Sequence, residues 1–236
     1  MPDSVTNAAP DEEKKTLPSH RVPVWDLPIR IFHWLLVLLV VLSFVTGKMG
    51  GTVMQYHEWS GVAVLVLLLF RLIWGFVGGA QARFSVFVTG PRKVFDYARS
   101  FFRADAKHYL GHNPMGGWSI IAMLVTLSIQ AGTGLFANDD ILTEGPLFEW
   151  VSKDTSDWLT RIHHINQNVL VALVALHIGA ILFYLVVKRE NLVAPMITGF
   201  KHWHEAVDPA RAMGSVTRAV FLVASLAIFT YMVIYG

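Results

Sequence analysis

Five long apolar runs constrain this chain more than any other feature of its sequence. They lie at 29–46, 56–77, 115–137, 162–187 and 216–235. Each approaches the 20 residues that an α-helix needs to cross about 30 Å of hydrocarbon. Only 15% of the residues are charged, and 236 residues are too few to bury five helices that are apolar on every face in a soluble core. We therefore predict an all-α integral membrane protein with five transmembrane helices.

The N-terminal residues and the absence of cysteine exclude several alternatives. Residues 1–24 are polar and contain no apolar stretch of the kind found in cleaved signals. We expect a disordered cytoplasmic tail over 1–24. The chain has no cysteine, which excludes disulfides, iron–sulfur clusters and thiolate ligation of haem. We find no phosphate-binding glycine loop, nucleophile triad or pair of catalytic carboxylates, and we expect no nucleic-acid partner.

The basic residues are distributed very unevenly between the two sides of the membrane. Most lie in the tail, between the second and third runs, and between the fourth and fifth runs. The opposite side has only Lys48, Lys153 and Arg161, and its segment 138–160 is acidic. The positive-inside rule then predicts a bacterial inner-membrane protein with a cytoplasmic N-terminus and a periplasmic C-terminus.

Four histidines fall within the apolar runs, where ionisable side chains are costly and require a reason. His33 lies early in the first run, His57 begins the second, and His163 and His177 lie in the fourth. With the predicted orientation, His57 and His163 share the outer level of the membrane. His33 and His177 share the inner level. We refer to these as the outer pair and the inner pair.

Helical phase supports this pairing. His163 and His177 are 14 residues apart, so they share a helix face to within about 40° and lie roughly 21 Å apart along the axis. The adjacent His164 is about 140° from His177, which leaves it to the membrane interface or to a haem propionate. Imidazole is a strong axial ligand of haem iron. We therefore predict two bis-histidine haem sites, one above the other in a four-helix bundle, as a path for electrons.

Two other roles are common for histidines in such positions. A single intramembrane histidine is usually a hydrogen-bonded residue between helices, but two depth-matched pairs are hard to obtain by chance. Zinc or copper would require three or four ligands at one level. His202 and His204 form a weak H-x-H metal signal in a solvated loop. For His108 and His112, interfacial packing is favoured over contact with a quinone headgroup.

Arg71 and the glycines of the runs offer weaker signals. Arg71 follows His57 by 14 residues, at the level of the inner pair, where it pairs with a propionate of the inner haem or snorkels to the membrane surface. Glycines lie within or at the ends of the runs, among them Gly47, Gly61 and Gly134. Small residues admit a flat macrocycle or serve ordinary helix packing.

Several stretches resemble the bacterial di-haem cytochrome b561 family, which includes the b-type cytochrome subunits of nickel–iron hydrogenases. They are VWDLPIRIFHWLLVLLVVLSFVTG, YHEWSG, HNPMGG, IHHINQNVLVALVALH and NLVAPMITG. The family's axial ligands correspond to His33, His57, His163 and His177. The resemblance implies a di-haem cytochrome b domain over 25–190 with two haems b as cofactors. Residues 191–236 would form a cytoplasmic loop and a fifth transmembrane helix without histidine.

The implied function is electron transfer between the quinone pool and a partner redox protein, a periplasmic c-type cytochrome or a metalloenzyme subunit. Whether the chain is also an enzyme stays open. The alternatives are an anchor subunit of a hydrogenase-like complex, a stand-alone quinone oxidoreductase acting on superoxide or another small substrate, and a haem-free transporter or scaffold. The acidic segment 138–160 could dock the partner, or it could simply favour the outer side.

Overall fold

The structure is a computed structural model that describes residues 19–101, 108–205 and 207–236. Its long helices are α1 (Leu27–Met49), α2 (Met54–Val77), α5 (Pro114–Gly134), α6 (Lys153–Val186) and α9 (Val216–Tyr235). In the described part of the chain, these five regions are long and apolar enough to cross a membrane. The prediction of an all-α membrane protein with five spans is confirmed.

Helix starts follow local capping signals. The Asp26 carboxylate accepts the Ile29 N–H at 2.9 Å at the start of α1, and Asn113 Oδ1 accepts the Gly116 N–H at 2.8 Å at the start of α5. Both helices have proline in their first turn, where its missing N–H has no cost. Helix α6 begins at Lys153, well before the apolar run, because Ser152 caps it and its first turns are polar but helical.

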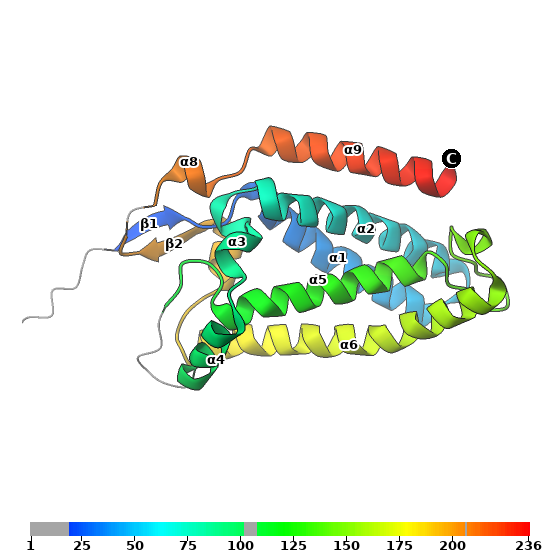
Figure 1. Cartoon of the computed structure of the whole chain (residues 1–236), viewed down its shortest axis with the longest axis horizontal. Helices are drawn as coiled ribbons and strands as arrows, with labels where there is room; N and C mark the ends of the chain where they lie inside the picture. Colours follow the sequence, from blue (N-terminus) through cyan, green and yellow to red (C-terminus); the bar gives the residue numbers. More distant parts are fainter. Residues whose placement is uncertain (1–18, 102–107, 206) are drawn as a thin grey trace, which may run out of the picture.

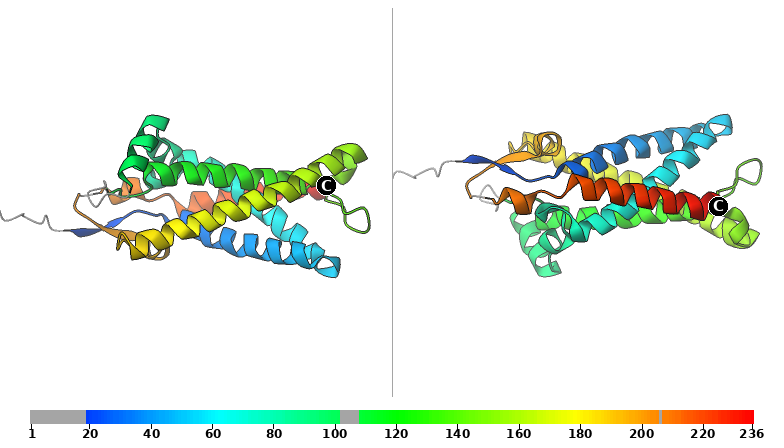
Figure 2. Two further views of the ribbon diagram at one scale, coloured as in Figure 1. Left: turned by 90° about the horizontal axis from the view of Figure 1, so that it is seen from below. Right: turned by 90° about the horizontal axis from the view of Figure 1, so that it is seen from above.

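The long helices form two hairpins and an added helix. Helix α1 packs along α2, α5 packs along α6, and the hairpins meet mainly between α2 and α5. Among the described residues, α1 and α6 make few or no direct contacts. Helix α9 packs on α2 at the outside of the four-helix bundle, as Figures 1 and 2 show. The bundle thus leaves the histidine-bearing helices α1 and α6 apart from each other.

Short elements close the two ends of the bundle. They are β1 (His20–Pro23), η1 (Gly51–Val53), η2 (Ala80–Ala82), α3 (Phe84–Phe87), α4 (Pro91–Ser100), η3 (Phe148–Trp150), α7 (Val193–Thr198), β2 (Phe200–Trp203) and α8 (Pro209–Ala212). Figure 1 shows the strands at one end and the segment that follows α5 at the other. Helix α4 is tied to α6 by the hydroxyls of Tyr97 and Tyr184, 2.6 Å apart.

The expected disordered tail over 1–24 is wrong for its last residues. Residues 1–18 lie outside the described part of the chain, but His20–Pro23 form β1 and pair antiparallel with β2. The sequence of this segment predicts a polar coil, but pairing with β2 satisfies its backbone N–H and C=O groups. Val22 and Val24 are buried. The strands also join the N-terminal segment to residues 191–236, across both of the domain boundaries that we predicted.

Candidate functional site

The structure brings the two imidazoles of the outer pair close together in a T-shaped arrangement. His57 projects from the first turn of α2 and His163 from α6, with ring centroids 6.0 Å apart and planes at 82°. Both side chains are half-buried. Metal–imidazole bonds are about 2 Å long. Two such bonds, together with the distance from the bonding nitrogen to the centre of each ring, add up to a length close to the separation of the two centroids. The arrangement could hold one metal atom between the imidazoles.

Hydrogen bonds orient both rings of the outer pair in the same way. The Nδ1–H of His57 donates to the Ser43 carbonyl of α1 at 2.8 Å, and that of His163 donates to the Gln130 carbonyl of α5 at 2.9 Å. A carbonyl accepts only from a protonated nitrogen, so each ring keeps the lone pair on Nε2. The Gln130 amide donates to that lone pair of His163 at 3.1 Å. An iron ion would take the lone pair in place of the amide.

Each imidazole of the outer pair packs on a glycine of its partner helix. A Cβ at Gly47 would lie 2.7 Å from His57 Nδ1, and a Cβ at Gly134 would lie 3.0 Å from His163 Cε1. The residue before each glycine is a buried threonine that donates to the carbonyl four residues earlier, at 2.7 Å for Thr46 and 2.6 Å for Thr133. The two hairpins thus position their outer histidines in the same way, by packing the ring on a glycine that follows a buried threonine.

The packing of His57 on Gly47 leads to a testable prediction. The substitution Gly47→Ala should displace the His57 ring and weaken haem retention at the outer site about tenfold, the lower end of the range for groups that orient metal ligands. Absorption spectra and haem quantification of the purified variant measure this. Gly132→Ala is the matched control, because a Cβ there meets no atom within 4 Å. Equal haem content in both variants would contradict the role of Gly47.

The inner pair is less tightly held by the protein. His33 of α1 and His177 of α6 are half-buried and close enough to interact electrostatically. The Nδ1 atom of His33 is buried and has no hydrogen-bond partner. The two rings lie on helices that barely touch. A group bound between α1 and α6 would supply the contact that these two helices lack at this level.

Arg71 lies in the same region as the inner pair, since Arg71, His33 and His177 all lie close enough to His112 to act on it electrostatically. Only 3% of its surface is exposed, so it does not snorkel to the membrane surface. Its guanidinium carbon lies 4.8 Å from the Phe84 ring centroid and 5.8 Å from that of Phe87. Its Nη1 atom is buried without a hydrogen-bond partner. A buried cationic donor without a partner fits an anionic acceptor such as a haem propionate.

Comparison with known proteins decides the family. The model of the prokaryotic cytochrome b561 family matches residues 24–199. The chain belongs to this family. It is therefore a b-type cytochrome of a bacterial membrane, and its cofactor is haem b.

Curated relatives carry closely similar names. The chain is 27% identical to the probable Ni/Fe-hydrogenase B-type cytochrome subunit of Bradyrhizobium diazoefficiens, over 86% of this chain and 95% of that protein. It is 27% identical to the corresponding subunit of Azotobacter chroococcum (81% and 92% covered). It is 26% identical to the probable Ni/Fe-hydrogenase 1 B-type cytochrome subunit of Escherichia coli K12 (75% and 89% covered). No solved structure matches the chain.

The donor set of this cytochrome suits haem better than a bare metal ion. No described residues form a group of three or more His, Cys, Asp or Glu side chains arranged to hold a metal ion. The histidines instead occur as two pairs at two levels. In the outer pair the lone pair of each ring is on Nε2, where that of His163 accepts the Gln130 amide, and Arg71 has a guanidinium nitrogen without a hydrogen-bond partner. These observations fit two haems with four axial histidines.

The remaining histidines of the cytochrome have other surroundings. His112 lies just before α5, with its ring centroid 4.6 Å from that of Trp25 and 5.2 Å from that of Phe87. Burial, together with the nearby Arg71, His177 and His33, lowers the pKa of His112 to about 3. The ring is thus neutral and packed among aromatic side chains. His108 contacts Glu190 at 3.2 Å, and His164 and His202 are exposed.

Sequence reasoning missed the residues that position the pairs. Ser43 and Gln130 act through backbone carbonyls, which no side-chain pattern reveals. Asp26 was also missed. Its carboxylate accepts the Ile29 N–H, the Trp74 indole N–H (3.1 Å) and the N–H groups of Gly79 (3.0 Å) and Gly214 (3.2 Å). An aspartate two residues before a proline signals a helix cap, but not the other three contacts.

Proposed function

We propose that this cytochrome holds two haems b, with His57 and His163 as axial ligands of the outer haem and His33 and His177 as those of the inner haem. It passes electrons across the membrane between the quinone pool and a partner redox protein. The observation that supports this most strongly is the outer pair, whose imidazole centroids lie 6.0 Å apart with both Nδ1–H groups bound to backbone carbonyls.

The protein's own groups have distinct tasks in this scheme. Haem iron, when bound, supplies reversible one-electron chemistry. The carbonyls of Ser43 and Gln130 hold the outer imidazoles in the tautomer that presents Nε2 and raise the basicity of that nitrogen. Arg71 would compensate the charge of a propionate at the inner level. His163 and His177 lie roughly 21 Å apart along α6. Two haems held at these levels would divide the path of electrons across the membrane into shorter steps.

The names of the relatives support a hydrogenase as the partner. Each is named as a B-type cytochrome subunit of a nickel–iron hydrogenase, which favours the anchor-subunit alternative over a stand-alone oxidoreductase. We propose that the N-terminus is cytoplasmic and that the partner docks on the periplasmic side, next to the outer haem. A soluble c-type cytochrome is the second partner that this side could accept.

The outer end of the bundle offers an exposed docking surface, the outer hairpin of residues 138–145, which the bridge between Asn138 and Glu144 closes. Asp139 Oδ1 accepts the N–H groups of Ile141, Leu142 and Thr143 at 3.0, 2.9 and 2.8 Å, and these hydrogen bonds lower the pKa of Asp139. Ile141 and Leu142 at the tip are 82% and 90% exposed. The hairpin thus presents two apolar side chains on a segment that carries Asp139, Asp140 and Glu144, of which Asp140 forms an ion pair with Lys153.

A visible difference spectrum tests the proposal directly. Dithionite-reduced minus oxidised spectra of the purified chain should show low-spin b haem, and pyridine haemochrome quantification should give two haems per chain. Co-purification of a nickel–iron hydrogenase would identify the partner. A chain expressed with adequate haem supply that binds one haem or none would contradict the di-haem assignment.

The acidic surroundings of the outer hairpin predict salt-sensitive electron exchange. Raising the salt concentration from low to about 0.5 M should slow exchange with a basic soluble c-type cytochrome about tenfold, because screening removes long-range attraction. Stopped-flow absorption measures the rate. The double variant D140N/E144Q should reduce this salt dependence. A rate for the unsubstituted chain that does not depend on salt would rule out electrostatic docking.

A further inference from the structure

A pocket at the inner end of the bundle, between the end of α2 and the start of α9, has no role in the scheme above. We call it the α2–α9 pocket. Its volume is about 610 Å³, within the range of sites for small ligands. Gly78 and Arg83 line it on the α2 side, and Gly214 and Arg218 line it on the α9 side. Figure 1 shows these helix ends on the same side of the molecule as the strands. The α9 side lies beyond residues 24–199, so residues outside the matched region complete the pocket.

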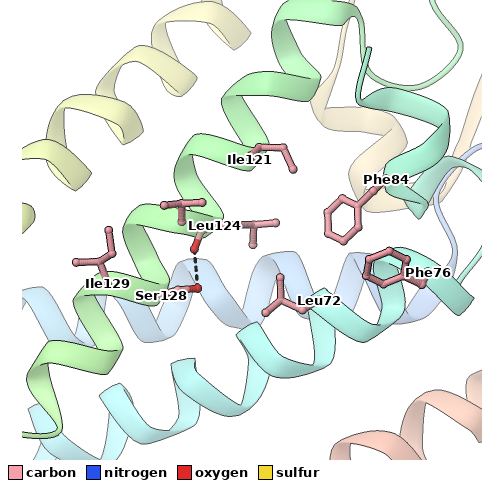
Figure 3. A pocket seen from close by; sticks show the side chains of 8 residues that line it. Leu72, Phe76, Phe84, Ile121, Leu124, Ser128 and Ile129 are labelled. Carbon is pink, nitrogen blue, oxygen red and sulfur yellow. Dashed lines mark hydrogen bonds between the residues drawn. The ribbon is translucent and has the colours of Figure 1, made fainter. Parts of the chain in front are cut away.

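The α2–α9 pocket differs chemically from the groove between α2 and α5. Figure 3 shows that groove, which is lined by aliphatic and aromatic side chains such as Leu72, Ile121 and Phe84. The Ser128 hydroxyl in its wall donates to the Leu124 carbonyl of the same helix at 2.8 Å. The groove therefore offers apolar surface to any lipid chain, whereas charged side chains in the α2–α9 pocket can select a ligand.

Two arginines line the α2–α9 pocket, and no acidic residue is among its lining residues in the described part of the chain. Arg83 Nε donates to the Gly78 carbonyl at 2.9 Å, and this bond engages one of the three guanidinium nitrogens. Neither Arg83 nor Arg218 forms an ion pair with a described residue. Guanidinium groups bind phosphate oxygens through pairs of parallel N–H bonds. The pocket thus suits an anion that carries a phosphate group.

The floor of the pocket is built on Asp26. Its carboxylate accepts the N–H groups of Gly79 at 3.0 Å and of Gly214 at 3.2 Å, which joins the two segments that line the pocket. A Cβ at Gly79 would lie 2.4 Å from the Ala212 carbonyl oxygen, so the segments already touch through backbone atoms. Asp26 itself is 2% exposed and accepts four N–H groups of described residues. Its single charge is therefore shielded from the pocket, where two guanidinium groups outnumber it.

Lipid-facing side chains begin next to the pocket. Val77 lines it at the end of α2, and Val216 follows a lining residue at the start of α9; both are exposed. One turn deeper in the membrane, Ile73 and Val220 are exposed as well. This end of the bundle also carries most of the basic residues of the chain, which attract the negative lipids of a cytoplasmic leaflet. A ligand with an anionic head and apolar chains thus matches both surfaces.

We propose that the α2–α9 pocket binds an anionic phospholipid, with its phosphate between Arg83 and Arg218 and its acyl chains along the exposed faces of α2 and α9. Phosphatidylglycerol, whose head carries one negative charge and no cation, has this chemistry. A zwitterionic lipid would bring its ammonium group next to two guanidinium groups. A free phosphate would leave the adjoining apolar surface unused. The bound lipid would fasten the fifth helix to the four-helix bundle, which gives this helix a role without a haem ligand.

Lipid retention by the purified, haem-loaded chain tests the proposal. The double variant R83Q/R218Q removes both guanidinium groups at two exposed positions and keeps polar side chains there. Its affinity for phosphatidylglycerol, measured by native mass spectrometry as lipid bound per chain in detergent, should fall about 25-fold, roughly fivefold for each arginine. Its affinity for phosphatidylcholine should not change. The variant R83K/R218K keeps both charges and should retain most of the affinity for phosphatidylglycerol.

The matched control is R92Q/K93Q, which removes the same charge from exposed positions in α4 that do not line the pocket. It should bind phosphatidylglycerol as the unsubstituted chain does, and haem absorption shows that each variant is folded. Equal loss in R92Q/K93Q and R83Q/R218Q would overturn the pocket, because total charge alone would then explain binding. The proposal is also overturned if R83Q/R218Q binds phosphatidylglycerol as tightly as the unsubstituted chain, or loses phosphatidylcholine equally. Displacement of the lipid by inorganic phosphate, beyond that by chloride at the same ionic strength, would assign the pocket to a free anion instead.

Discussion

Replacing His163 with leucine should leave a cytochrome with about half of its haem and no electron transfer between the two faces of the membrane. The His163 ring lies 6.0 Å from the His57 ring between centroids, and its Nδ1–H is bound to the Gln130 carbonyl. Leucine has no lone pair for iron, so the outer haem would lose one of two axial ligands. The inner haem, at a different level, should keep its spectrum. Haem quantification and reduction kinetics in proteoliposomes measure both effects.

The adjacent residue provides a closely matched control for this prediction. His164 is exposed and lies about 100° around the helix from His163, so His164→Leu removes an imidazole without removing a predicted ligand. It should retain both haems and most of the electron-transfer rate. Equal haem loss in H163L and H164L would mean that the fourth helix is perturbed in general. Full haem content in H163L would overturn the assignment of His163.

Replacing Asp26 with alanine should destabilise the protein more than any other single change outside the haem ligands. Its side chain is 2% exposed and accepts N–H groups from Ile29, Trp74, Gly79 and Gly214. These groups belong to the start of α1, the end of α2 and the segment before α9. Alanine would leave buried donors unsatisfied and remove the acidic neighbour of Arg71, which costs about 3 kcal/mol or more. Thermal unfolding in detergent measures the loss.

Two variants make this prediction specific. Asp139 also accepts three backbone N–H groups, but it does so in the exposed outer hairpin, so Asp139→Ala should change the unfolding temperature much less. Asp26→Asn keeps one acceptor oxygen, and its loss of stability should be intermediate. If D26A unfolds at the same temperature as D139A, the buried carboxylate does not hold the three segments together.

The transmembrane helices could be predicted from sequence because hydropathy and helix length are local properties. Each apolar run lies within or close to a helix of the structure, and the prediction of a four-helix bundle with an added helix was confirmed. The start of α6 at Lys153 was missed, because polar residues that form helix outside the hydrocarbon give no hydropathy signal. The strand β1 was missed because its partner β2 lies about 180 residues later.

The part of the candidate site that depends only on helical period and membrane depth was predictable from sequence. The spacing of His163 and His177 on one helix, and the levels of His33 and His57, follow from the rise and turn of an α-helix. Their assignment as haem ligands stays a prediction that the H163L experiment tests. The burial of Arg71 was not predictable, since the same residue at the same depth could have reached the membrane surface.

The sequence by itself determined the spans, the levels of the four histidines and the family, because these depend on composition, spacing and motif order. Only the tertiary structure decided which atoms meet: the carbonyls of Ser43 and Gln130 with the outer imidazoles, the rings with Gly47 and Gly134, and Asp26 with donors from three segments. Such contacts depend on the distance and rotation between packed helices. Those quantities are set by side-chain packing over the whole bundle and leave no periodic trace in one segment.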